Sequence, residues 1–253
     1  MPSKYLSFYK ALQNWLPLAG LILAAVLSAL WVMLINLPAL LITQWRRHYF
    51  DALWSRLGHH SDAGLSAAKT NLLSQARGTI LDVGAGHGHS FKYLPRAQIT
   101  RVISLEPNEL MHPKIAAAAA SAGLSPSQVE ISNVPIEQIF AHYSAGTIDI
   151  VYCNLVLCSV KDPKGAISNI YDLLKPGGKL MFLEHIRAED AEGQEKQDWI
   201  SQYWCWFFDG CRLNKPMDLW VREFKWTEVE IKPLDPEREK GTYFWHVAGV
   251  CTK

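Results

Sequence analysis

Three glycines recur at every second position in the stretch DVGAGHG, directly after a short apolar run. The run ends at Asp82, and the glycines are Gly84, Gly86 and Gly88. Glycine lets the backbone reach positive φ and lets a small molecule approach without a Cβ in the way. A second acid, Glu106, follows the next apolar run, where it could accept both hydroxyls of a ribose. The pattern therefore indicates a nucleoside-containing ligand against the backbone.

The spacing of the glycines separates two kinds of ligand. A dinucleotide site has G-x-G-x-x-G, which lets a pyrophosphate lie at a helix N-terminus. Here the third glycine comes one position early, and His89 stands where that fingerprint needs glycine. A nicotinamide oxidoreductase is therefore disfavoured. The motif D-x-G-x-G-x-G instead resembles motif I of the class I S-adenosylmethionine-dependent methyltransferases, whose ligand has no phosphate.

Strand and helix signals alternate around this turn. Helices are expected over 90–95, 109–123 and 162–178, between short apolar runs that read as parallel strands. We predict an α/β fold with a doubly wound, mostly parallel, seven-stranded sheet of Rossmann-like type. The last two strands have no helix between them, so the final strand is expected to be antiparallel and to insert into the sheet. Six of the expected strands cover residues 78–84, 99–107, 129–134, 179–186, 224–234 and 242–253, and the fourth strand in chain order lies within 148–160.

The N-terminal residues have a different character from the rest. Between Ala11 and Trp45 the chain carries no charged residue, and about 20 apolar residues suffice to cross a bilayer as a helix. We predict a membrane anchor over residues 1–45, a helical linker over 46–75 that breaks near GHHSDAG, and a catalytic domain over 76–253. Asn36 and Pro38 interrupt the apolar run, so a spanning helix and a monotopic hairpin both remain open.

Composition excludes several functions. The 253 residues carry a formal net charge of only +1, which provides no field to attract nucleic acid. The five cysteines form no CxxC pair and no zinc-type cluster, so we expect no metal site. An odd number of irregularly spaced cysteines favours reduced thiols and a domain that faces the cytosol.

Three further segments narrow the resemblance. NLVLCSVKDP (154–163), LLKPGGKLMFLEHI (173–186) and FDGCRLN (208–214) are similar to the methyltransferase-like protein 7 family, as is the uncharged N-terminus. Members of that family are monotopic membrane enzymes of the endoplasmic reticulum and lipid droplets that methylate alkyl thiols. The resemblance implies S-adenosyl-L-methionine as cofactor, a small lipophilic thiol as acceptor and membrane lipid as a partner. It departs at Glu106, where the family usually has aspartate, and around 199–208.

The resemblance also implies roles for single residues. Asp82 and the three glycines would hold the methionine end of the cofactor, and Glu106 would bind its ribose. Residues after the second, third and fourth strands would surround the adenine and the methyl group. These are Pro107 and Asn108 at the adenine edge, Val134 and Glu137 beside the ring, and Asn154 and Leu155 facing the methionine and the methyl group.

Methylation of a thiol needs a thiolate, and an unperturbed cysteine-like thiol has a pKa of about 8.5. His185, which follows the fifth strand, and Asp209, in a later loop, are the candidate catalytic residues. A structural histidine is an equally good interpretation of His185. Residues 198–210 gather three tryptophans and two phenylalanines, as either a buried helix or an apolar lid over the acceptor.

The same motifs leave two other functions open. A lipophilic phenol or amine could be the acceptor on the same fold, which would make the protein an O- or N-methyltransferase. A catalytically idle membrane or lipid-droplet protein could also keep the fold. The intact glycines and Glu106 disfavour that idle protein but do not separate sulfur from oxygen or nitrogen acceptors.

Overall fold

The computed structural model describes residues 19–31 and 45–253. Contacts divide the chain into two compact units, Met1–Arg56 and Leu57–Lys253. The described part of the first unit consists of a helix over 19–31 and the beginning of α3 (Trp45–Gly64), which continues into the second unit. α3 and α4 (Ser66–Leu73) are separated at Leu65, directly after the GHHSDAG segment where a break was expected.

Most of the predicted membrane anchor lies outside the described residues, which do not include 1–18 and 32–44. The part that is described is a helix over 19–31. Within 19–31 and 45–253, no helix is both long enough and apolar enough to cross a membrane. The expected membrane-anchor helix is therefore not supported in the described part of the chain.

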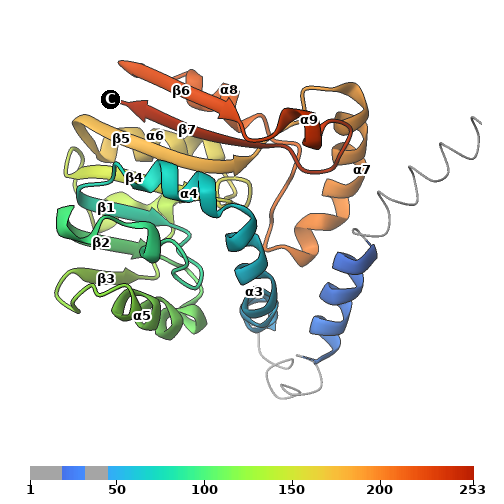
Figure 1. The fold of residues 1–253 in the computed structure, drawn as a ribbon, viewed down its shortest axis with the longest axis horizontal. Coiled ribbons are helices and arrows are strands. Elements are labelled where there is room, and N and C mark those ends of the chain that lie inside the picture. Colours follow the sequence, from blue (N-terminus) through green and yellow to red (C-terminus); the bar gives the residue numbers. More distant parts are fainter. Residues whose placement is uncertain (1–18, 32–44) are drawn as a thin grey trace, which may run out of the picture. The chain divides into compact units, whose positions relative to one another are not determined.

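The second unit is built on a seven-stranded sheet with the order β3-β2-β1-β4-β5-β7-β6 (Figure 1). The first five strands are parallel, and β7 runs antiparallel to both of its neighbours, β5 and β6. The predicted sheet with an inserted antiparallel last strand is therefore confirmed. The strands are β1 (Gly78–Val83), β2 (Ile99–Leu105), β3 (Val129–Ser132), β4 (Ile148–Asn154), β5 (Leu174–His185), β6 (Glu228–Pro233) and β7 (His246–Thr252).

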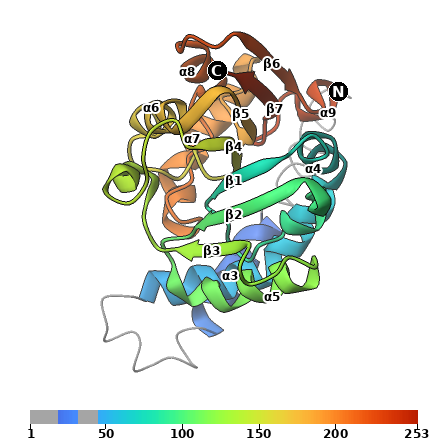
Figure 2. The same cartoon turned by 90° about the vertical axis from the view of Figure 1, so that its left-hand side faces the viewer.

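Both faces of the sheet are covered, as the continuous apolar runs of the central strands require. Successive residues of β1 point to opposite faces: Ile80 lies in one core cluster with Leu73 of α4 and Ile115, whereas Leu81 lies in a second cluster with Ile167. Figure 2 shows α4 and α6 on opposite sides of the sheet. The later helices are α5 (His112–Ser121), α6 (Pro163–Leu173), α7 (Ala191–Phe207), α8 (Met217–Arg222) and α9 (Pro236–Glu239).

The prediction of a helix directly after the glycine turn is wrong. That segment forms two single 3₁₀ turns instead, η1 (Phe91–Tyr93) and η2 (Arg96–Gln98). Pro95 accounts for the difference, because proline disfavours the helical conformation of the residue before it, and Leu94 is extended with ψ 135°. The turn therefore leads into an irregular connection rather than a regular helix.

Candidate active site

The glycine turn begins where β1 ends and is held against β2. Gly84, Gly86 and Gly88 have φ values of 67°, 58° and 74°, in the left-handed region that side chains rarely adopt. The N–H of Gly84 donates to the carbonyl of Leu105 at 2.8 Å. A Cβ on Gly84 would lie 2.3 Å from Cγ2 of Val156. Both the conformation and the close approach therefore require glycine at this position.

Glu106 joins the glycine turn to the segment after β2. Its buried carboxylate accepts hydrogen bonds from the N–H of Gly86 at 2.8 Å and of Asn108 at 2.9 Å. Asn108 is also buried and opens the 3₁₀ turn η3 (Glu109–Met111), whereas Pro107 is exposed. The structure thus brings together the acid and the turn that the sequence separates by twenty positions.

Asp82 is a buried carboxyl at the end of β1. Burial raises its pKa to about 7, the charge of Lys69 opposes this shift, and the neighbouring Glu106 carboxylate adds to it. A cationic group beside Asp82 would therefore lower this pKa and favour the ionised carboxylate. The ammonium group of an amino acid has the required charge.

Asn154 and Leu155 lie at the carboxyl end of β4. Leu155 has φ 53°, which is rare for a branched side chain, and its N–H donates to the carbonyl of Leu183 at 2.8 Å. The Oδ1 atom of Asn154 is buried and has no hydrogen-bond partner within the described residues. An orphaned buried acceptor beside a strained backbone marks a place where a ligand can donate.

The residues predicted beside adenine follow β3. Val134 is buried, whereas Glu137 is exposed in the turn η4 (Ile136–Ala141). The Oε1 atom of Glu137 accepts from the N–H of Lys161 at 3.3 Å. Val134 therefore packs in the hydrophobic core, and Glu137 ties this turn to the loop that follows β4.

Glu184 is an important residue that the sequence analysis missed. Its fully buried Oε1 accepts from the N–H groups of Val156 and Leu157, each at 2.9 Å, so it holds the loop after β4. Burial raises its pKa to about 7, against the opposing effect of these hydrogen bonds. An acid inside the apolar run LMFLEHI was the available signal, because a buried strand rarely contains an unpaired carboxylate.

The two predicted catalytic residues lie on different elements. His185 ends β5, and its buried Nδ1 has no partner within the described residues. Burial, followed by the charge of His246, lowers the pKa of His185 well below its usual value, so its imidazole stays neutral. Asp209 is exposed in the turn after α7, with φ 48°. A neutral His185 can orient a substrate but is a weak proton acceptor.

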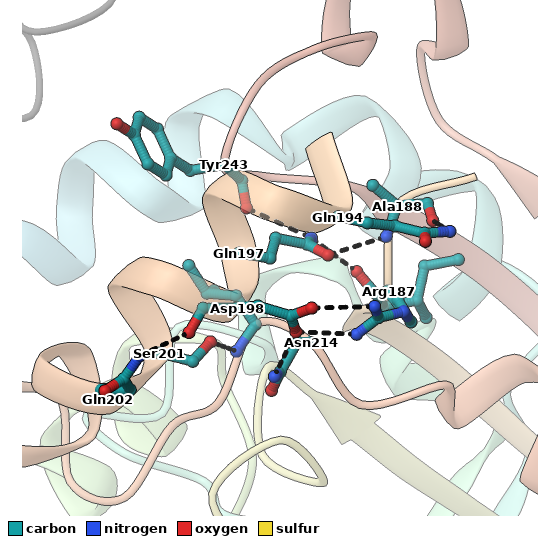
Figure 3. A network of polar contacts seen from close by, with 11 residues as sticks. Arg187, Ala188, Gln194, Gln197, Asp198, Ser201, Gln202, Asn214 and Tyr243 are labelled. Atoms are coloured by element: carbon teal, nitrogen blue, oxygen red, sulfur yellow. Dashed lines mark hydrogen bonds and ion pairs between the residues drawn. The ribbon is translucent and has the colours of Figure 1, made fainter. Parts of the chain in front are cut away.

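Helix α7 is fixed to the end of β5 by a buried amide. Gln197 accepts from the N–H of Ala188 at 2.8 Å and donates to the carbonyls of Ile186 at 2.9 Å and Tyr243 at 3.3 Å. Figure 3 shows this side chain pointing from α7 toward the backbone of the two segments. The single residue thereby joins the exit of β5 to the entry of β7, which are the two segments beside His185.

A methyltransferase domain model matches residues 57–219, which include the glycine turn, Glu106 and the end of β5. The fold is also that of geranyl diphosphate C-methyltransferase from Streptomyces coelicolor, solved with S-adenosyl-L-homocysteine. That structure superposes with a TM-score of 0.62 at 15% identity and covers 83% of this chain and 84% of its own. The chain belongs to the class I S-adenosylmethionine-dependent methyltransferases.

Within that class, the proteins similar to this chain over most of its length include thiol methyltransferases. Human thiol S-methyltransferase TMT1A is 31% identical over 177 residues, which are 69% of this chain and 70% of that protein. Human thiol S-methyltransferase TMT1B is 29% identical over 244 residues, which are 90% of this chain and 98% of that protein. The chain belongs to this family, as the sequence resemblance predicted.

Proposed function

We propose that this protein transfers the methyl group of S-adenosylmethionine to the sulfur of a small lipophilic thiol. The observation that carries the proposal is the similarity to thiol S-methyltransferases along nearly the whole chain, at 29% identity over 244 residues. A scaffold that had lost its activity would have no need to keep the glycine turn and the Glu106 carboxylate together.

The residues at the carboxyl edge fit the cofactor. Asp82 would bind the ammonium group of the methionine, Glu106 the ribose hydroxyls, and the orphaned Oδ1 of Asn154 a further donor of the methionine. When bound, S-adenosylmethionine supplies an activated methyl group. The chain's own task is then to align the acceptor in line with that methyl group and to exclude water.

The surroundings of His185 favour an apolar acceptor. Trp204 of α7 is buried, stacks on Phe208 with ring centroids 3.7 Å apart, and meets Phe244 edge-on at 5.5 Å. Phe244 lies 5.6 Å from the ring of His185. Trp206, by contrast, is 72% exposed on α7. The aromatic segment therefore contributes both a buried wall and an exposed face, and the wall favours a lipophilic molecule.

Labelled methyl transfer to an alkyl thiol, a phenol and an amine tests the proposed acceptor. With the full chain in detergent, we expect transfer to the thiol, with little to the other two, and loss of transfer in Glu106→Ala. Transfer to the phenol or the amine alone would replace the thiol by an oxygen or nitrogen acceptor. Tight cofactor binding with no methyl transfer to any of the three acceptors would contradict the proposed function.

The proposal includes association with a membrane through residues 1–45, with the catalytic domain on the cytosolic side of the endoplasmic reticulum or of a lipid droplet. Its support is the uncharged sequence and the exposed side chains of the helix over 19–31, among them Leu23, Leu27 and Trp31, each more than half exposed.

Charge placed on this helix is expected to release the protein from membranes. In flotation with phospholipid vesicles, we expect the full chain to float and the double variant Leu23→Asp, Leu27→Asp to stay at the bottom, since a buried carboxylate opposes insertion. Leu219→Asp, at an exposed leucine of α8, is the matched control and should float. Equal flotation of all three proteins would contradict anchoring through this segment.

A further inference from the structure

A carboxylate and an imidazole form a close pair beside the predicted acceptor site. The Nδ1 atom of His246 lies 2.6 Å from Oε1 of Glu239, at the end of α9. The N–H of His246 donates to the other carboxylate oxygen, Oε2, at 2.8 Å. Both side chains are mostly buried, with 15% and 14% of their surfaces exposed. Glu239 therefore holds both the ring and the backbone of His246.

This geometry determines which nitrogen of His246 can accept a proton. An ionised carboxylate only accepts hydrogen bonds, so Nδ1 must carry the hydrogen of the short contact with Glu239. Nε2 then holds the lone pair. A carboxylate that fixes the tautomer and stabilises the charged ring is the arrangement that makes histidine an effective general base.

The pair lies at the edge of the sheet where the residues predicted to bind the cofactor follow the parallel strands. His246 begins β7 and is the register partner of His185, with ring centroids 4.4 Å apart. On the other side of β5, Asn154 is the register partner of Leu183. His246 and Asn154 thus lie on the two strands that flank the end of β5, each strand about 5 Å from β5 at the usual spacing between neighbouring strands.

The surroundings of His246 suit proton transfer from an apolar acceptor. The rings of Phe244 and His246 are stacked with centroids 6.3 Å apart, and the neutral ring of His185 lies 4.4 Å from that of His246. Gln197 binds the carbonyls of both Ile186 and Tyr243, which holds the two histidine-bearing segments together. The base is therefore positioned by three elements, β5, α7 and α9.

We infer that His246 is the general base of the thiol methyltransferase reaction and that Glu239 is its positioning residue. This inference rests on the proposed function. The S–H bond of the acceptor breaks as Nε2 of His246 takes the proton, and the sulfur forms a bond to the methyl carbon as the sulfonium C–S bond breaks. The products are a thioether and S-adenosylhomocysteine, and the imidazolium passes its proton to water.

The test compares two thiols of different acidity in the full chain. An alkyl thiol is mostly protonated at pH 7, whereas a nitro-substituted aryl thiol is already ionised and needs no base. In His246→Gln, we expect kcat/KM for the alkyl thiol to fall about 100-fold or more, and that for the aryl thiol to fall by less than about threefold. Glu239→Gln should show the same selectivity with a loss of roughly 10-fold.

His60→Gln, at an exposed histidine of α3, is the matched control and should keep both rates. If His246→Gln lowers kcat/KM equally for both thiols while the variant remains folded and binds the cofactor, His246 has a structural role and the inference is wrong. Unchanged rates on both thiols would overturn it as well. A wild-type protein that methylates neither thiol would instead contradict the proposed function, so the two failures are distinguishable.

Discussion

Replacing Glu106 by alanine is expected to weaken binding of S-adenosylmethionine about 100-fold or more. The carboxylate is predicted to accept two ribose hydroxyls, and hydrogen bonds to a charged group contribute about 1.5–3 kcal/mol each. The substitution also leaves the N–H groups of Gly86 and Asn108 without the partner they have in the structure. Isothermal titration calorimetry with the full chain measures the dissociation constant directly.

The matched control is Glu109→Ala, which removes an exposed carboxylate three positions further along the chain. We expect its affinity to stay within about twofold of the wild type, because Glu109 is not among the residues placed at the ribose. An affinity of Glu106→Ala within threefold of the wild type, in a protein with an unchanged circular dichroism spectrum, would mean that the ribose is held elsewhere.

Binding of S-adenosylmethionine is expected to tighten steeply between pH 5 and pH 7 and to level off above pH 7. Burial raises the pKa of Asp82 to about 7, so this carboxyl is mostly protonated at pH 5 and cannot pair with the ammonium group of the ligand. Since the ionised fraction rises from about 1% at pH 5 to about half at pH 7, the dissociation constant should fall by about 50-fold over that range. Calorimetric titrations at half-unit intervals measure the slope.

Asp82→Asn should bind weakly at every pH and show no slope, because its side chain does not ionise. Glu184 requires its own control, since burial raises the pKa of that carboxyl into the same range. Glu184→Gln should keep the slope if Asp82 is its origin. If the pH dependence of binding persists in Asp82→Asn and disappears in Glu184→Gln, its origin is Glu184, which holds the loop after β4.

The cofactor half of the site could be predicted because its pattern is local. A strand, a turn and the next strand bring Asp82, the glycines and Glu106 to one edge of a parallel sheet, and parallel strands leave little freedom in that arrangement. The inserted antiparallel strand was predictable because the sequence shows no long helix between the last two strands, and the 4-residue α9 that lies there is too short for a parallel crossover. By contrast, the helix expected before Pro95 does not form. The proline excludes it locally, although the alternation of strands and helices in this fold predicts a helix there.

The acceptor half of the site depends on residues that lie far apart in the sequence. His185 could be singled out by its place after an apolar strand, but its low pKa comes from burial and from His246 across the β5–β7 pair. Neither His246 nor Glu239 carries a recognisable motif. Their pairing exists because α9 turns back onto the start of β7.

The sequence by itself predicted the family, the seven-stranded sheet with its antiparallel last strand, and the cofactor. These features follow from backbone geometry and from motifs whose residues lie close together in the sequence. Only the tertiary structure decided which carboxyls are buried, which imidazole stays neutral and which one is held by a carboxylate. Ionisation and proton transfer depend on desolvation and on distances of a few ångströms, and both are created by contacts between distant segments.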